Sequence, residues 1–187
     1  MFIARVFLSL CVGLVLVAPC AGLTQTSAAT PLPVIVIPKA DLSSMNFLVG
    51  TWSCSKQESG LPAPYTATVT YAVSPDGRWI EQTSVWDPVP WFPNKWTSND
   101  KITYDAYTKR WVDVEYDEIG GYFLATSRGW AGNTIVWHDP TFTPSPKVAS
   151  ATDTTMTKVS DSKVTSTWSI TKPNNEIISA NTTCTKS

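Results

Sequence analysis

The chain has 187 residues, a formal net charge of −1 and nine tryptophans. Its 14 basic side chains are scattered along the sequence, so there is no electrostatic footprint for nucleic acid or for an anionic membrane, and neither partner is expected. The length is enough for one domain with a substantial core and too short for two ordinary ones.

The N-terminal residues 1–29 have the order of a secretory signal peptide. Arg5 precedes an apolar run over residues 6–17, which is too short to span a membrane, and small residues follow it. Cleavage is expected either near residues 21–22 or after the small tripeptide at 27–29, and the second site is preferred. The sequence therefore predicts a secreted or periplasmic protein with no integral membrane segment after cleavage.

The rest of the chain is divided into a short arm and a strand-rich domain. Residues 30–44 are punctuated by prolines and are interpreted as a linker or extended arm, so the folded domain is expected at 45–187, with one helical turn near 42–47. Tyr65–Val73 has the period-two alternation of a half-buried strand. The same rhythm recurs between turn residues, and ten strands are expected, at 48–56, 65–73, 79–86, 101–105, 110–116, 121–127, 134–139, 151–160, 163–171 and 176–184.

Many short strands at this spacing are typical of an all-β sandwich or barrel. After removal of the signal, Cys54 and Cys184 remain and suggest one disulfide, with a pair of free thiols as the alternative. Because a disulfide requires Cα atoms within about 7 Å, the first and last strands would be neighbours, which an up-and-down meander achieves by closing on itself. We therefore predict a single antiparallel up-and-down β-barrel of about ten strands, with a short helical turn before the first strand.

The stretch NFLVGTWSC at 46–54 places this helical turn directly before Gly50 and Trp52. The G-x-W entry resembles that of calycin barrels, the group that holds lipocalins, fatty-acid-binding proteins and nitrobindins. The chain also resembles an uncharacterised family of bacterial barrel proteins known as a domain of unknown function, in its motifs DGRWIEQ, YDAYTKRWV and GGYFLATSRGW. The resemblance covers most of residues 46–185. It implies a calycin-like barrel in which Gly50 and Trp52 are structural and Trp52 plugs the closed end.

Two features differ from these relatives. Lipocalins place an arginine near the last strand to cover the G-x-W tryptophan, whereas this chain has Lys172 or Lys186 there. Nitrobindin-like barrels bind haem through a histidine near the C-terminus, yet no histidine follows His138. With a single histidine in the domain and no C-x-x-C spacing, the sequence predicts no cofactor and no metal site.

His138 is the one residue that could serve as the base of a hydrolytic triad. Asp139 is a poor orienting group because neighbours on a strand point to opposite faces, and the sequence has no G-x-S-x-G elbow. His138 could still act as a lone acid or base at a barrel mouth. A solvated strand end is the preferred interpretation, and no catalytic residue is assigned.

Asp113 and Glu115 share one face of a strand, with Cβ atoms about 6.5–7 Å apart, a separation that paired-carboxylate glycosidases use. The opposite face of this strand carries Val112, Val114 and Tyr116 and is the apolar one. The two carboxylates are therefore expected to face solvent.

The tryptophans are the strongest non-random feature, above all in WDPVPWFPNKW at 86–96. The prolines of this loop restrict its backbone, which suits either a lip over a cavity or a plug inside it. We expect the loop at 128–133, which carries Trp130, to lie at the same end of the barrel.

From these features we expect the barrel interior to bind a small apolar or aromatic molecule. Glu81 would contact this molecule if its side chain points inward. One alternative is a cyclase, isomerase or decarboxylase that uses the same cavity, and another is a carbohydrate or protein interaction module built on the 86–96 loop. The candidate ligand-binding residues are Glu81, Trp86, Trp91, Phe92, Trp96 and Trp130.

Overall fold

A computed structural model describes residues 38–90, 92–118, 120–138, 150–151 and 153–187. The predicted signal peptide, most of the predicted arm and Trp91 lie outside the described residues. Within the described residues, no helix is both long enough and apolar enough to cross a membrane.

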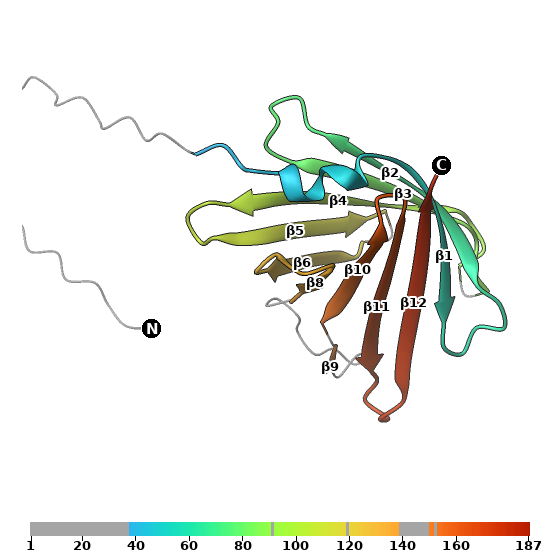
Figure 1. The fold of residues 1–187 in the computed structure, drawn as a ribbon. Coiled ribbons are helices and arrows are strands. Elements are labelled where there is room, and N and C mark those ends of the chain that lie inside the picture. Colours follow the sequence, from blue (N-terminus) through green and yellow to red (C-terminus); the bar gives the residue numbers. More distant parts are fainter. Residues whose placement is uncertain (1–37, 91, 119, 139–149, 152) are drawn as a thin grey trace, which may run out of the picture. The chain divides into compact units, whose positions relative to one another are not determined.

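The described part of the chain folds into one antiparallel, up-and-down sheet that curls into a half-barrel, preceded by a short 3-10 helix (Figure 1). The predicted fold class is therefore confirmed. Neighbouring strands follow the order β6-β5-β4-β3-β2-β1-β12-β11-β10-β8-β7, and β9 pairs with β11 off this path. The elements are η1 (Ser43–Leu48), β1 (Gly50–Glu58), β2 (Tyr65–Val73), β3 (Ile80–Trp86), β4 (Trp96–Asp105), β5 (Arg110–Asp117), β6 (Tyr122–Ser127), β7 (Trp130–Ala131), β8 (Thr134–Trp137), β9 (Ser150–Ala151), β10 (Thr154–Ser160), β11 (Lys163–Thr171) and β12 (Ile177–Lys186).

The two ends of the curled sheet meet at a short seam. Thr126 on β6 and His138 just after β8 form an isolated antiparallel bridge, in which each backbone N–H donates to the other residue's carbonyl oxygen at 2.8 Å. His138 therefore has a structural role through its backbone, because it joins β6 at one end of the path to the end of β8 near the other.

Strand β2 shows why the alternating sequence forms this sheet. Tyr65, Ala67 and Val69 are buried, while the threonines between them are exposed. Since successive side chains of a strand point to opposite faces, this pattern gives the sheet a solvent-exposed outer face and a buried inner face.

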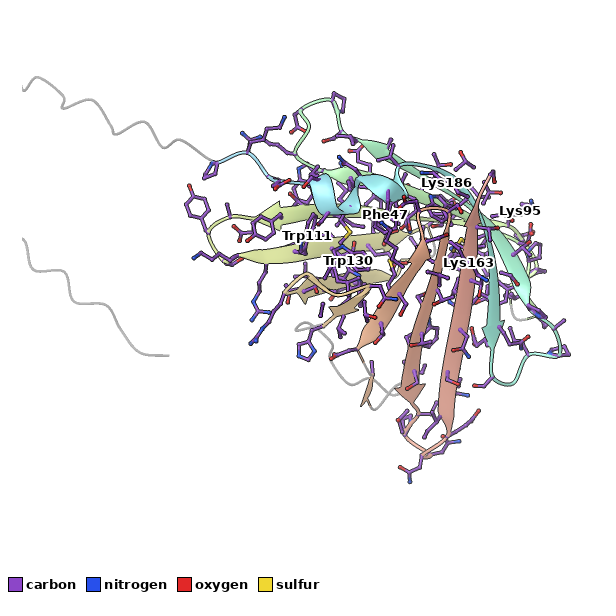
Figure 2. The ribbon with its side chains drawn as sticks, viewed as in Figure 1. Phe47, Lys95, Trp111, Trp130, Lys163 and Lys186 are labelled. Atoms are coloured by element: carbon purple, nitrogen blue, oxygen red, sulfur yellow. A yellow bond between two sulfur atoms is a disulfide. The ribbon has the colours of Figure 1, made fainter. Side chains whose placement is uncertain are left out.

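One end of the half-barrel is closed by η1 and Trp52. The Trp52 side chain is fully buried, and its Nε1 donates a hydrogen bond to the Leu48 carbonyl at 2.6 Å. Lys186 on β12 lies with its ammonium 5.4 Å from the Trp52 ring centre and donates to the Phe47 carbonyl at 2.9 Å. A cation on the last strand thus covers the tryptophan of the first strand, and Figure 2 shows Lys186 near Phe47.

Gly50 permits this contact. Its φ is +127°, a conformation that other residues rarely adopt, and a Cβ at this position would lie 2.9 Å from Cε of Lys186. Any side chain here would strain the backbone and push the lysine away from its site.

The first and last strands are neighbours, as the cysteines predicted. In the β1–β12 ladder Cys54 lies directly opposite Cys184, their Cα atoms are 4.0 Å apart, and a disulfide joins them across 130 residues of sequence. The bond links β1, the first strand of the chain, covalently to β12, the last.

We predict that the Cys54→Ala/Cys184→Ala double variant loses about 2–5 kcal/mol of unfolding free energy, because the unfolded chain gains the freedom of a long loop. Urea unfolding of the purified protein would measure this loss. The matched control is Ser55→Ala/Thr183→Ala, an exposed pair one position along in the same ladder, which should change stability by less than about 0.5 kcal/mol. Equal stability of the cysteine variant and the wild type would contradict the prediction.

Candidate functional site

A cavity of about 500 Å³ lies inside the half-barrel, beyond the Trp52 plug. Cys54, the next inward residue of β1 after Trp52, already forms part of its wall. We call this space the barrel cavity. Its aromatic wall comprises Tyr71, Trp86, Trp96, Phe123, Trp137 and Trp168, and its main polar residues are Lys56, Gln82, Ser84, Asp100, Asp113 and Glu115.

The inward direction of Asp113 and Glu115 corrects the sequence-based expectation that they face solvent. Both side chains line the barrel cavity, whereas Tyr116 on the other face of β5 is 49% exposed. The reason is Trp111, which is 5% exposed and has the same parity as the two carboxylates. Burial of this indole turns the acidic face of β5 inward and Val114 outward.

Strand register brings a third carboxyl beside them. Asp100 on β4 lies opposite Glu115 on β5, and on its other side lies opposite Gln82 on β3. The Gln82 amide donates hydrogen bonds to Asp100 Oδ2 and to Ser84 Oγ. One row of the inner face thus holds an amide and two carboxyls, and Asp113 lies two residues from Glu115 on the same face.

The surroundings of these carboxyls favour their neutral forms. Burial raises the pKa of Asp113 to about 8, with a further contribution from the charge of Glu115. Burial also raises the pKa of Asp100 well above its usual range, helped by the charges of Asp113 and Glu115, and raises the pKa of Glu115. Tyr71, whose pKa is raised by burial and by the same three carboxyls, stays a neutral hydroxyl.

Lys56 is the cation of the cavity wall. Its ammonium lies 4.8 Å from the ring centre of Trp168, 5.2 Å from that of Trp86 and 5.7 Å from that of Tyr65. Burial lowers the pKa of Lys56, and the negative charges of Glu58 and Glu115 oppose this shift. Three aromatic faces thus replace part of the hydration that the ammonium loses.

Two indoles stack at the end of the β3–β4 ladder, where Trp86 and Trp96 lie on paired strands. The Trp86 and Trp96 ring centres are 5.6 Å apart with an interplanar angle of 17°, and Trp86 Nε1 donates to Ser98 Oγ at 3.3 Å. Trp96 Nε1 is buried without a hydrogen-bond partner among the described residues, as is Asp113 Oδ1. Each such atom costs about 1–3 kcal/mol, so the cavity holds one unused donor and one unused acceptor.

The candidate residues that the sequence suggested are only partly brought together. Trp86 and Trp96 line the barrel cavity, and Phe92 is half-buried in a backbone bridge with Val89 beside it. Trp91, on which the choice between lip and plug depends, lies outside the described residues. Trp86 and Trp96 therefore belong to the aromatic wall of the cavity.

Glu81 lies outside the cavity. Its carboxylate forms an ion pair of 3.0 Å with Lys101 on the exposed face of the sheet, because Ile80, Gln82 and Ser84 occupy the inner positions of β3. The condition under which Glu81 would contact a ligand, an inward side chain, is therefore not met.

Trp130 lies at the opposite end of the half-barrel from the 86–96 loop. Its ring packs edge-on against Phe47 of η1, with ring centres 5.6 Å apart, and Figure 2 shows these two rings near Trp111. The expectation of a shared end is wrong because three strands, β4, β5 and β6, run between the two loops, and an odd number of strand passages ends at the opposite end. Trp130 belongs to the closed end.

His138 also lies outside the barrel cavity. Its side chain is exposed, and Nδ1 pairs with the carboxylate of Asp153. Both residues line a second hollow on the outer side of the seam, together with Arg110 and Arg128. The solvated strand end that the sequence suggested agrees with this exposed position.

Lys56, Asp100 and Gln82 are functional candidates that sequence reasoning did not single out. Lys56 has the same parity on β1 as Trp52 and Cys54, so its inward direction could have been inferred from them. Asp100 and Gln82 carry no such local signal, because their place follows from the pairing of β3 with β4.

Comparison with known proteins adds no functional assignment. No family model matches the chain, and no curated protein matches it. Among solved structures it is similar to a protein of unknown function of the DUF3598 family from Nostoc punctiforme, at 15% identity and a TM-score of 0.38. The match covers 86% of this chain and 53% of that protein, so the chain spans about half of the other protein's length.

The raised carboxyl pKa values predict that stability falls as the pH rises. Asp113 has a pKa of about 8 in the folded protein against 3.8 ordinarily, so the folded state holds more protons than the unfolded chain between these values. Unfolding free energy therefore decreases from pH 4 to pH 8, and Asp100 and Glu115 act in the same direction. We expect a higher Tm at pH 5 than at pH 8 in thermal unfolding followed by circular dichroism.

The Asp113→Asn variant should have a weaker pH dependence and a higher Tm at pH 8, by about 3 °C for each kcal/mol recovered. Asp161→Asn, at a residue whose side chain is 86% exposed, is the matched control and should keep the wild-type profile. A wild-type Tm that rises between pH 5 and pH 8 would show that the carboxyls are not protonated in the fold.

Proposed function

We propose that the protein binds a small, largely aromatic or apolar molecule in the barrel cavity. The observation that carries this proposal is a cavity of about 500 Å³ whose wall contains stacked indoles and two buried polar atoms without partners. Ligand sites commonly occupy about 300–1,000 Å³ and combine an apolar wall with a few polar groups that orient the ligand. The barrel cavity has both properties.

The scaffold suits binding because the wall is built from hydrogen-bonded strands. Trp86 and Trp96 lie at the facing ends of β3 and β4 and hold each other by stacking, so little side-chain entropy remains to be lost when a flat ligand packs on them. The Cys54–Cys184 disulfide supports the same wall and is the kind of bond that persists in an oxidising compartment. It therefore also supports the proposal that the protein is secreted or periplasmic.

Acid–base catalysis in the same cavity is a second candidate function. The observation that favours it is Asp113, whose pKa of about 8 lies in the range that a general acid or base needs at neutral pH. A cyclase, isomerase or decarboxylase could use this carboxyl beside the neutral hydroxyl of Tyr71. Turnover of a bound compound that is lost in Asp113→Asn would favour this function over binding alone.

The binding proposal predicts saturable, one-to-one uptake of the neutral dye N-phenyl-1-naphthylamine, measured by its fluorescence increase, with a Kd in the micromolar range. Trp96→Ala removes one ring of the stacked pair and should weaken the dye at least about tenfold, which corresponds to about 1.4 kcal/mol. Tyr107→Ala, at a turn residue that is 66% exposed, should leave the Kd unchanged.

Circular dichroism should first establish that both variants fold. Dye fluorescence that rises without saturation, or a Trp96→Ala variant that binds as tightly as the Tyr107→Ala variant, would contradict a ligand site in this cavity.

A further inference from the structure

We infer that the ligand of the barrel cavity carries a basic nitrogen, protonated at neutral pH, that is bound by the carboxyl groups of Asp100, Asp113 and Glu115. The inference rests on the proposed function, since it specifies the chemical class of the molecule held in the same cavity. The class is an amine with a flat aromatic or apolar body.

The position of the three carboxyls supports a common partner. They lie on adjacent strands, with Asp100 opposite Glu115 in the β4–β5 ladder and Asp113 two residues along the same inner face. All three line the cavity, and Asp100 is only 5% exposed. A single ligand group that enters this region therefore meets acidic oxygens from two strands.

The three carboxyls have no cation in salt-bridge contact among the described residues, although the charge of Lys56 acts to lower the pKa of Glu115. Among the same residues, Asp113 Oδ1 has no hydrogen-bond partner at all. Lys56 is held instead between the faces of Trp168, Trp86 and Tyr65. A ligand ammonium would supply the missing donor, whereas a ligand carboxylate would add a fourth acid to the same wall.

The aromatic wall is also suited to a cation. The ammonium of Lys56 lies 4.8 Å and 5.2 Å from the ring centres of Trp168 and Trp86, so the rings of this cavity accommodate a cation. The buried Nε1–H of Trp96 has no partner among the described residues and could donate a hydrogen bond to an acceptor on the body of the ligand. The wall therefore favours a molecule with one cationic end and a flat remainder, and disfavours an anionic fatty acid or an acidic aromatic compound.

Protons compete with a cationic ligand for the carboxyl groups, so the affinity for the ligand should increase with pH. An ammonium prefers ionised carboxyls, and Asp113 with a pKa of about 8 loses its proton as the pH rises from 6 to 8 while an alkylamine stays charged. Affinity for the amine should therefore rise at least about tenfold over this range. The other charged and titratable groups that line the cavity with Asp113 are Asp100 on β4, Glu115 on β5, Tyr122 on β6, Tyr71 on β2 and Lys56 on β1.

The test uses three probes with the same ring system: 2-(1-naphthyl)ethylamine, 1-ethylnaphthalene and 1-naphthylacetate. Their affinities for the wild-type protein are measured at pH 8 by displacement of N-phenyl-1-naphthylamine. We expect the amine to bind at least tenfold more tightly than 1-ethylnaphthalene, and the acetate to bind most weakly. The amine should also weaken at least tenfold at pH 6, whereas 1-ethylnaphthalene should not change.

Two variants test whether the preference for the amine depends on the carboxyl groups. Asp113→Asn and Glu115→Gln should each reduce the preference for the amine over 1-ethylnaphthalene at least fivefold, and the second keeps the test valid if the first folds poorly. Asp161→Asn is the exposed control and should keep the wild-type preference.

Two results would overturn the inference while leaving the cavity as a binding site. One is equal or tighter binding of 1-ethylnaphthalene or the acetate, and the other is an amine preference that survives in both carboxyl variants. Failure of the dye and of all three probes to bind would instead overturn the proposed function itself, and the inference with it.

Discussion

The buried side chain of Trp111 sets the direction of every other residue on β5. A strand alternates its faces with a period of two, so once this indole is inside, Asp113 and Glu115 must follow it and Val114 and Tyr116 must face out. Burying an indole contributes several kcal/mol, and the carboxyls limit their own penalty by taking up protons. The acidic inner wall is therefore a consequence of where one large apolar side chain packs.

Turn chemistry keeps β5 in this register. The carboxylate of Asp105 accepts hydrogen bonds from the backbone N–H of Tyr107 at 2.9 Å and from the hydroxyl of Thr108 at 2.7 Å, and Lys109 takes a positive φ of 54°. This turn sets the β4–β5 pairing, in which Tyr104 lies opposite Trp111 and Asp100 opposite Glu115. A slip by one residue would expose Trp111 and lose the turn, so the strand keeps its acidic face inside.

The structural contacts of the closed end and the residues of the candidate site lie in different parts of the half-barrel. At the closed end η1, Trp52 and Lys186 join the start of the chain to its last strand through apolar burial and paired polar atoms. Farther along the strands, the barrel cavity has three carboxyls with raised pKa values and unsatisfied polar atoms. Of the three buried side-chain polar atoms without a partner among the described residues, two lie in the cavity, where a ligand could satisfy them, and the third is Trp130 Nε1 at the closed end.

More of the fold than of the candidate site could be predicted from the sequence. Alternation predicted most strands, and the positions of Cys54 and Cys184 predicted that the first and last strands pair. The sequence predicts the wrong inner face for β5 because three apolar residues, Val112, Val114 and Tyr116, lie on the face opposite Trp111. A buried tryptophan nevertheless removes more apolar area from water than a valine does. For Glu81 the parity was ambiguous, since polar Gln82 and Ser84 fill the inner positions of β3. Asp100 was missed because the predicted strand begins at residue 101, whereas β4 begins at Trp96 and pairs Asp100 with Glu115 across the β4–β5 hairpin.

The central claim is that Asp113 and its neighbours are buried carboxyls that face one cavity. Carbon-detected NMR titration of the side-chain carboxyl groups, with assignment through Asp113→Asn, tests it most directly. We expect the Asp113 carboxyl to titrate near pH 8, and those of Asp100 and Glu115 to titrate above their ordinary range. Midpoints near pH 4 for all three would show instead that the carboxyls are in water on the outer face.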